Sequence, residues 1–151
     1  MLQENKESIS RQVEKYRKDV AELARYRGWL ESRSGQDLTK LVDPAEGKQP
    51  TMQVPVYDST LLAFVKSARK TAFIDRNYMY TYRRLRIKDA DDELRQISRV
   101  QIMEIEVLGA ILSSYILKGQ TKGTVWNEGV RNGVYLAIVD KMQELIDFWT
   151  A

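Results

Sequence analysis

Val107-Leu108-Gly109-Ala110-Ile111-Leu112-Ser113-Ser114-Tyr115-Ile116-Leu117 is the longest apolar-leaning run without a charge in this chain of 151 residues. Such a run is far shorter than the ~20 residues that a helix needs to cross a bilayer. Large apolar residues around it recur every three or four positions, which predicts a helix. We expect the central buried helix here, from a capping-box pair at Ser98 and Gln101 to about Lys118, with Gly119 ending it. Its apolar positions are Val100, Met103, Val107, Leu108, Ile111, Leu112 and Tyr115.

On the C-terminal side, the pattern predicts two more helices. Thr124 can cap a short one, and Asn132-Gly133 then breaks or bends it. The last helix is expected over about Val134–Trp149. Its apolar face consists of Leu136, Val139, Met142, Leu145, Ile146 and Trp149.

On the N-terminal side, three helices are expected before the central one. The first begins at Asp58 or Ser59, either of which can cap it, and runs to about Ile74. The second spans about Arg76–Arg86, and the third is a short acidic helix opened by Asp89 or Asp91. The apolar face of the first consists of Leu61, Leu62, Phe64, Val65, Ala68 and Ala72.

The first 32 residues predict a long helix, with a seam of apolar residues on one face. This seam can pack on the rest of the domain or on a second copy of the chain, and the sequence leaves both alternatives open. The seam consists of Ile9, Val13, Tyr16, Val20, Leu23 and Leu30.

Residues 33–57 contain all three prolines, Pro44, Pro50 and Pro55, together with Gly35 and Gly47. This stretch cannot be a regular helix, so it is a functional loop, a packed arm or a linker. We therefore predict one all-α domain over residues 1–151. It is a compact multi-helix bundle with a long N-terminal helix (1–32), an extended loop (33–57) and a helical core (58–151).

The chain has no histidine and no cysteine. This excludes Ser-His-Asp and thiol catalysis, thiolate metal sites and histidine-ligated metals. The acidic groups Asp91-Asp92-Glu93 and Glu104/Glu106 fit solvated helix surfaces better than a metal site. We assign no catalytic, cofactor or metal-binding residue, and an enzyme is disfavoured. The polar start, Met1 to Glu7, lacks the apolar core of a signal peptide, so we expect a cytoplasmic protein.

Charge is divided sharply between two neighbouring segments. Residues 66–88 hold eight Lys and Arg against one acid, a net +7, whereas residues 89–106 hold six acids against two Arg, a net −4. The basic segment contains tyrosines, and this mixture can bind phosphates and stack on unpaired bases. Alternatively, the two segments neutralise each other. The nucleic-acid candidates are Arg69, Lys70, Arg76, Tyr80, Arg83, Arg84 and Arg86.

A second polar cluster surrounds Trp126. Glu128 and Arg131 are three residues apart and can pair on one helix face. Together with Trp126 and Tyr115 they can line a small pocket, which would allow a small-molecule or hydrolytic site. The alternative is a surface helix anchored by one tryptophan.

From Val56 onward the chain resembles a family of small, uncharacterised helical proteins that is common in Gram-positive bacteria. The resemblance rests on Pro55-Val56-Tyr57 before Leu62-x-Phe64-Val65, on Asn77-Tyr78, and on the spacing of apolar residues from Leu108 to Leu145. It covers residues 55–147 and implies a helical fold in the bacterial cytoplasm, without an activity. The family has an Arg-Gly-Glu-Arg-Phe-like run after its central helix. Lys118-Gly119-Gln120-Thr121-Lys122 lacks the acid, the second arginine and the aromatic, which puts a family ligand there in doubt.

Two functions follow as hypotheses. The first is a non-enzymatic helical domain that binds a protein partner or a second copy of itself through the seam of the N-terminal helix. The alternative is an accessory protein that binds nucleic acid through residues 66–88.

Overall fold

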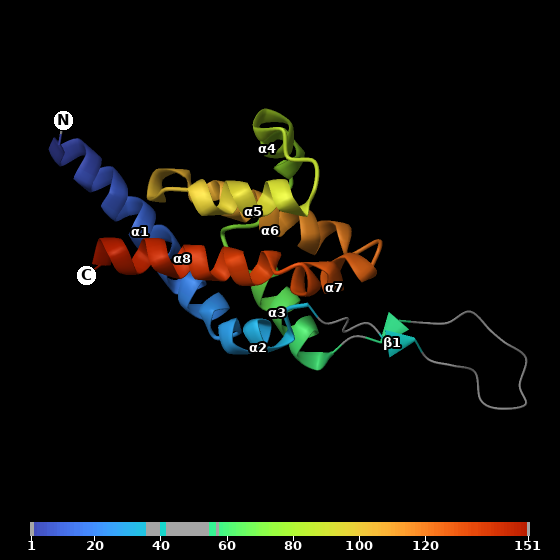
Figure 1. The fold of residues 1–151 in the computed structure, drawn as a ribbon. Helices are drawn as coiled ribbons and strands as arrows, with labels where there is room; N and C mark the ends of the chain where they lie inside the picture. Colours follow the sequence, from blue (N-terminus) through green and yellow to red (C-terminus); the bar gives the residue numbers. More distant parts are fainter. Residues whose placement is uncertain (1, 36–39, 42–54, 57, 151) are drawn as a thin grey trace, which may run out of the picture.

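The computed structural model describes residues 2–35, 40–41, 55–56 and 58–150. Helices dominate these residues, and the prediction of an all-α bundle with a long N-terminal helix is confirmed (Figure 1). None of the described helices combines the length and the apolar character needed to cross a membrane. The elements are α1 (Leu2–Ala24), α2 (Arg27–Arg33), β1 (Lys40–Leu41), β2 (Pro55–Val56), α3 (Ser59–Arg69), α4 (Tyr78–Leu85), α5 (Ala90–Arg99), the 3₁₀ turn η1 (Ile102–Glu104), α6 (Glu106–Lys118), α7 (Thr124–Arg131) and α8 (Val134–Thr150).

Helix α6 is the buried helix at the centre of the bundle. Every residue from Val107 to Ile116 is buried, because apolar side chains surround the whole helix instead of one stripe. Helices α3, α4, α5, α7 and α8 all contact it. The cleft described below lies at its C-terminal half, where hydroxyl side chains replace aliphatic ones.

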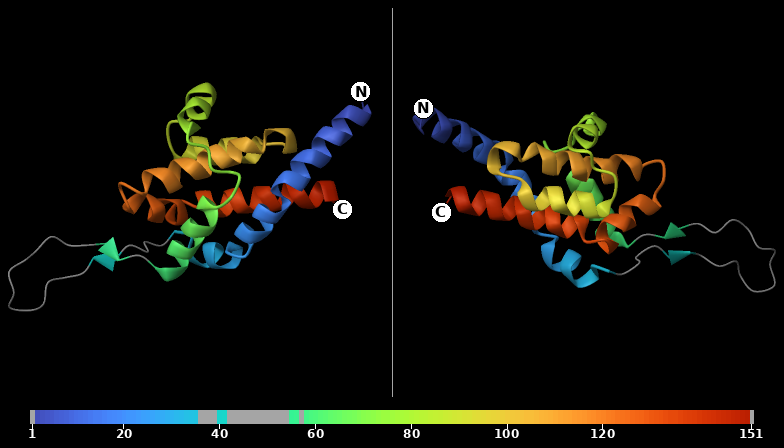
Figure 2. Two further views of the ribbon diagram at one scale, coloured as in Figure 1. Left: turned by 180° about the vertical axis from the view of Figure 1, so that it is seen from behind. Right: turned by 45° about the horizontal axis from the view of Figure 1, so that its top comes forward.

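The two longest of the described helices are the first, α1, and the last, α8, and they cross each other (Figures 1 and 2). Of the seam on the N-terminal helix, Val13, Tyr16, Val20, Leu23 and Leu30 are buried within the chain. The ring of Tyr16, for example, stacks on Phe73 with centroids 4.4 Å apart. The chain's own helices therefore cover the seam. This corrects its assignment as the surface for a partner or a second copy, because a covered side chain cannot also contact another molecule.

The N-terminal helix is broken near Tyr26, where one continuous helix to residue 32 is predicted. The side chain of Tyr26 is held by α3: its hydroxyl lies 2.9 Å from Ser67 Oγ, and its ring packs edge-on against Phe64. The chain turns there and resumes as α2, which buries Leu30.

The expected start of the central helix at Ser98 is wrong. Ser98 lies in the last turn of α5 and donates a hydrogen bond to the Arg95 carbonyl oxygen. Val100 is then extended, and α6 begins only at Glu106. The extended backbone at Val100 ends the helix, and the Val100 side chain is buried in the core. The 3₁₀ turn between the two helices leaves Met103 48% exposed, although its spacing predicts a core residue.

Asp58 and Asp89 begin helices as predicted. Asp58 Oδ1 accepts a hydrogen bond from Thr60 N at 2.7 Å, and Asp89 Oδ1 accepts one from Asp92 N at 2.8 Å. The expected cap at Thr124 is wrong, because Thr124 is the first helical residue and Gly123 takes the cap position without a side-chain bond.

Within the predicted loop, β1 and β2 pair antiparallel, with Lys40 opposite Val56 and Leu41 opposite Pro55. Gly35, at φ 85°, donates its backbone N–H to the Arg131 carbonyl oxygen at 3.0 Å and so connects the end of α2 to α7. Pro44, Gly47 and Pro50 lie outside the described residues.

Candidate functional site

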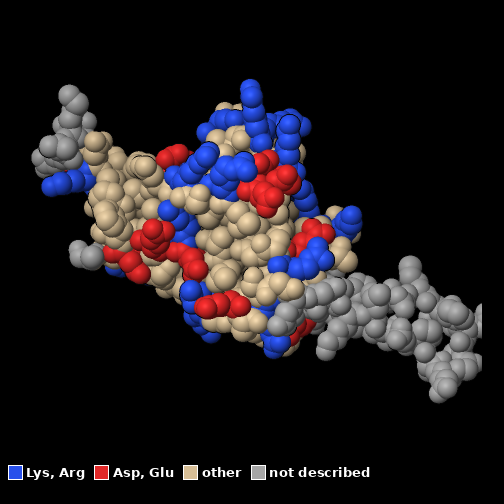
Figure 3. Space-filling model, in the orientation of Figure 1, with Lys and Arg blue, Asp and Glu red and all other residues tan. Residues whose placement is uncertain are grey.

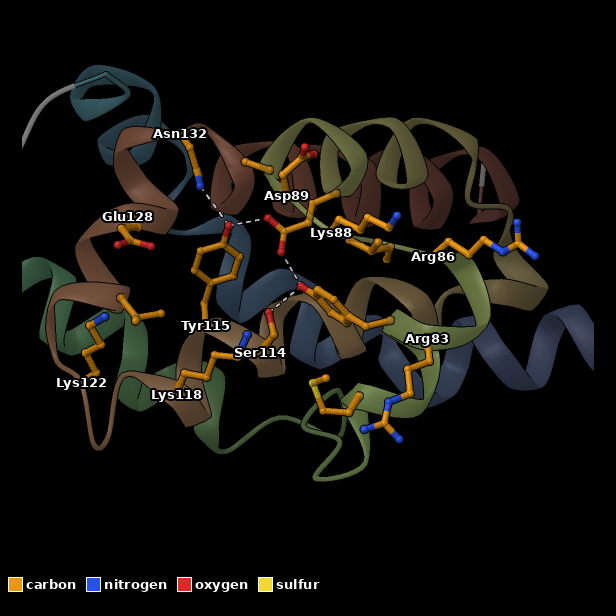
Figure 4. Close-up of a pocket in the computed structure, with 16 residues that line it drawn as sticks. Arg83, Arg86, Lys88, Asp89, Ser114, Tyr115, Lys118, Lys122, Glu128 and Asn132 are labelled. Carbon is orange, nitrogen blue, oxygen red and sulfur yellow. Dashed lines mark hydrogen bonds between the residues drawn. The ribbon is translucent and has the colours of Figure 1, made fainter.

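A cleft with a volume of about 730 Å³ lies between α4, the start of α5, the C-terminal half of α6, and α7 (Figure 4). This volume falls within the ~300–1,000 Å³ range of small-molecule sites. Most of the residues that line it have charged or hydrogen-bonding side chains, and the others are Met79, Ile87, Ala90 and Val125.

Five cationic side chains surround the cleft. Lys118 and Lys122 lie on one side, and Arg83, Arg86 and Lys88 on the other (Figure 4). Two tyrosine rings position the Lys118 ammonium, which lies 5.7 Å from the centroids of both Tyr78 and Tyr82. All five are exposed, and none forms an ion pair within the part of the chain that the structure describes. They are therefore free to bind an anion.

A buried carboxylate, Glu93, forms the floor of the cleft and is only 6% exposed. Tyr115 donates its hydroxyl hydrogen to Glu93 Oε1 at 2.5 Å, and Tyr82 donates to Oε2. The Tyr82 hydroxyl also lies 2.6 Å from Ser114 Oγ, and Asn132 Nδ2 donates to the Tyr115 hydroxyl at 2.9 Å. This polar network connects α4, α5, α6 and the end of α7.

Burial sets the protonation of this floor. It raises the pKa of Glu93 above its ordinary value, although the two tyrosine hydrogen bonds and the nearby Lys118 oppose the shift. Burial, and then the Glu93 carboxylate, also raise the pKa of both Tyr82 and Tyr115 far above the ordinary value. Both phenols therefore keep their protons at neutral pH and remain hydrogen-bond donors.

The residues proposed from the sequence for nucleic acid do not form one site. All seven are exposed, and basic side chains gather over α4 in Figure 3, with acidic ones beside them. Only Arg83 and Arg86 line the cleft. Arg84 lines a separate small hollow beside Glu104 and Glu106, Arg69 and Lys70 lie at the end of α3, and Arg76 and Tyr80 line neither. Among the described residues, no ion pair joins segment 66–88 to segment 89–106.

Of the residues predicted to form a pocket around Trp126, likewise only some line the cleft. Tyr115 and Glu128 line the cleft, but Trp126 and Arg131 do not. Trp126 instead packs against Gly119, where a Cβ would lie 2.0 Å from its ring, and its Nε1 donates to the Ile116 carbonyl oxygen at 3.0 Å. Arg131 is exposed on α7 and forms no ion pair with Glu128 among the described residues.

Glu93, at the centre of the site, is not among the residues predicted from the sequence. The acidic group Asp91-Asp92-Glu93 was expected on a solvated helix surface. Glu93 stands four residues before the buried Ile97, so the two share the inner face of α5. An acid on an inward-facing stripe is a signal that could have revealed it. Lys88, Lys118 and Lys122 were missed because only the packing of four elements brings them together.

The arrangement suits binding better than acid–base chemistry. Both oxygens of Glu93 already accept a phenol hydrogen, which favours a fixed acceptor over a mobile proton carrier. Among the residues that the structure describes, no cluster of three or more acidic side chains is placed to hold a metal ion.

Comparison of the chain with protein-family models, with curated proteins and with solved structures finds no match. The resemblance of residues 55–147 to a bacterial helical family therefore stays a prediction. The cleft is therefore the feature of this chain that bears on function, because a fold alone does not define one.

Proposed function

We propose that this chain is a non-enzymatic binding domain whose cleft takes a phosphate-bearing ligand of nucleotide size. The single observation that supports the proposal is a set of five exposed cationic side chains around one cleft with a buried carboxylate at its floor. The proposal keeps the phosphate chemistry of the nucleic-acid hypothesis but narrows its site, because only Arg83, Arg86 and Lys88 of segment 66–88 line the cleft, together with Lys118 and Lys122.

The rim suits phosphate. Guanidinium and ammonium groups bind phosphate oxygens through charge-assisted hydrogen bonds, about twice as strong as neutral ones. Arg83 and Lys122 lie on opposite sides of the cleft, so both walls carry cationic donors.

The floor of the cleft suits the part of such a ligand that carries hydrogen-bond donors. The carboxyl oxygens of Glu93 act as hydrogen-bond acceptors, so they suit the N–H or O–H donors of a ligand and not its phosphate oxygens. Each of these Glu93 oxygens accepts one phenol hydrogen and retains a lone pair for a ligand. A nucleotide has a phosphate at one end and base N–H groups at the other, which matches this polarity.

Two sources share this chemistry, a free nucleotide and the end of a single strand of nucleic acid. Calorimetric titrations with inorganic phosphate, nucleoside monophosphates and short single-stranded oligonucleotides distinguish them. Tighter binding of the oligonucleotide assigns the site to a strand end, and equal or tighter binding of the mononucleotide assigns it to a free nucleotide. The absence of binding to all three probes at low salt overturns the proposal.

A pair of matched variants connects binding to the cleft. The double variant R83A/K122A removes one cation from each side, and we expect affinity to fall by about 10- to 100-fold. The control K70A/R84A removes the same charge from exposed positions outside the cleft and should bind like wild type. An equal loss in both variants would indicate a general charge effect and would contradict a specific site.

A further inference from the structure

An apolar groove far from the cleft lies between the junction of α5 with η1 and the last turns of α8. Its volume is about 330 Å³, and Val100, Ile102, Leu145, Phe148 and Trp149 contribute its apolar lining. Phe148 is 71% exposed and Trp149 44% exposed, with their rings edge to face and centroids 5.0 Å apart. The last helix was predicted to bury Trp149, so the structure places an apolar surface where the sequence predicts a core residue.

Exposed apolar surface of this kind is typical of a binding site. An exposed aromatic pair beside an apolar hollow has the composition of an interface core, in which Phe and Trp are enriched. We propose that the groove is a self-association surface, and that its occupant is the same groove of a second copy of this chain.

Size supports this occupant. A cavity of ~150 Å³ holds a benzene molecule, so a groove of this volume accommodates a phenyl ring with space to spare. A two-fold axis beside the groove would place Phe148 of the partner subunit in the groove of the first copy, and the reverse. Each copy thus buries Phe148, which is the most exposed aromatic side chain among the described residues.

Charge supports it as well. The polar edge of the groove has one side chain of each sign, Lys141 and Glu144, whose ionic groups lie 3.3 Å apart. The carboxylate of Glu144 remains 66% exposed and can accept a second cation. In a two-fold interface a contact from residue i to residue j of the other copy is repeated from j to i, so an axis that sets Glu144 opposite Lys141 of the partner subunit forms the pair twice. A surface that holds both signs is complementary to itself.

Light scattering coupled to size exclusion, with the full chain, tests the proposal. We expect a concentration-dependent dimer for wild type and a monomer for F148S/W149S. The control Y80S removes another exposed aromatic, 62% exposed on α4, and should remain dimeric. All these side chains are exposed, so the variants should keep their helical circular dichroism. A monomeric wild type at every concentration that remains in solution, or a dimer that survives F148S/W149S, overturns the proposal.

Charge reversal tests the identity of the occupant. K141E places Glu opposite Glu144 across the axis, and E144K places Lys opposite Lys141, so each variant alone should dimerise less than wild type. In an equimolar mixture, K141E and E144K can form a mixed dimer in which every facing pair is again opposite in sign. Recovery of the dimer in the mixture alone supports a two-fold interface between copies. Equal dimerisation in the mixture and in the separate variants contradicts it.

Discussion

Gly109 of α6 lies directly against the backbone of Phe73, and a Cβ on Gly109 would be only 2.5 Å from the Phe73 carbonyl oxygen. The same contact is extended by Ser113, whose Oγ accepts a hydrogen bond from Asp75 N at 2.7 Å. The segment between α3 and α4 is therefore held tightly on the central helix, which positions α4 beside the cleft.

We expect Gly109→Ala to lower the free energy of unfolding. Repacking around an added methyl group costs ~1–3 kcal/mol, and here the neighbour is backbone that cannot rotate away. The gain in helix propensity is only ~1 kcal/mol. The control is Gly28→Ala, since a Cβ on Gly28 meets nothing within 4 Å and should raise stability. Urea unfolding of both variants measures the difference, and similar values for the two would contradict the close contact.

Two buried tyrosines should respond oppositely to the loss of a hydroxyl. Among the described residues, the Tyr135 hydroxyl is buried without a hydrogen-bond partner, whereas Tyr115 bonds both Glu93 and Asn132. Tyr135→Phe should therefore raise the free energy of unfolding by up to ~1 kcal/mol, and Tyr115→Phe should lower it by ~1.5–3 kcal/mol. Thermal unfolding of the two variants provides the test. A stabilising Tyr115→Phe would contradict a stabilising role for the hydrogen bonds of Tyr115.

Asp89 combines two roles that Asn and Ala separate. Its carboxylate caps α5 and also lines the cleft. Asp89→Asn keeps a good cap and removes the charge, so stability should be preserved while phosphate-bearing ligands bind more tightly. Asp89→Ala should bind them more tightly as well but lose ~1 kcal/mol of stability. Calorimetry and chemical unfolding together separate the two effects. Unchanged binding in both variants would place the anion away from Asp89, and weaker binding would contradict the assigned repulsion.

Glu93 should make stability depend on pH. Its pKa is raised in the folded chain, so between the ordinary value of 4.5 and the folded value the native state binds more protons than the unfolded state. The free energy of unfolding contributed by Glu93 therefore falls as pH rises through this interval. Glu93→Gln lacks this titration, so the stability of wild type relative to the variant should decline with rising pH. Unfolding curves across a pH series measure the difference in the free energy of unfolding between wild type and variant. A difference that rises with pH would contradict a raised pKa for Glu93.

The helices and several of their ends follow from local patterns, because apolar spacing and caps such as Asp58 act over a few residues. The break near Tyr26 could not be predicted, since Tyr26 there contacts Ser67 on another helix and local spacing does not reveal such a contact. The exposure of Met103 likewise depends on where a neighbouring helix ends. Only some of the residues that line the cleft could be predicted from the sequence, Tyr115 and Glu128 among them. Its cations and its buried Glu93 converge through packing, which single-sequence spacing does not encode.

The crossing of α1 and α8 has a consequence during biosynthesis. The apolar stripe of the first helix finds its cover partly on the last helix, more than 100 residues later in the chain. The ribosome makes α8 more than 100 residues after α1, so Val13, Val20 and Leu23 lack this part of their cover while the intervening chain is synthesised. Until α1 and α8 meet, the nascent chain should stay soluble only if a chaperone covers this apolar stripe or if aggregation is slow.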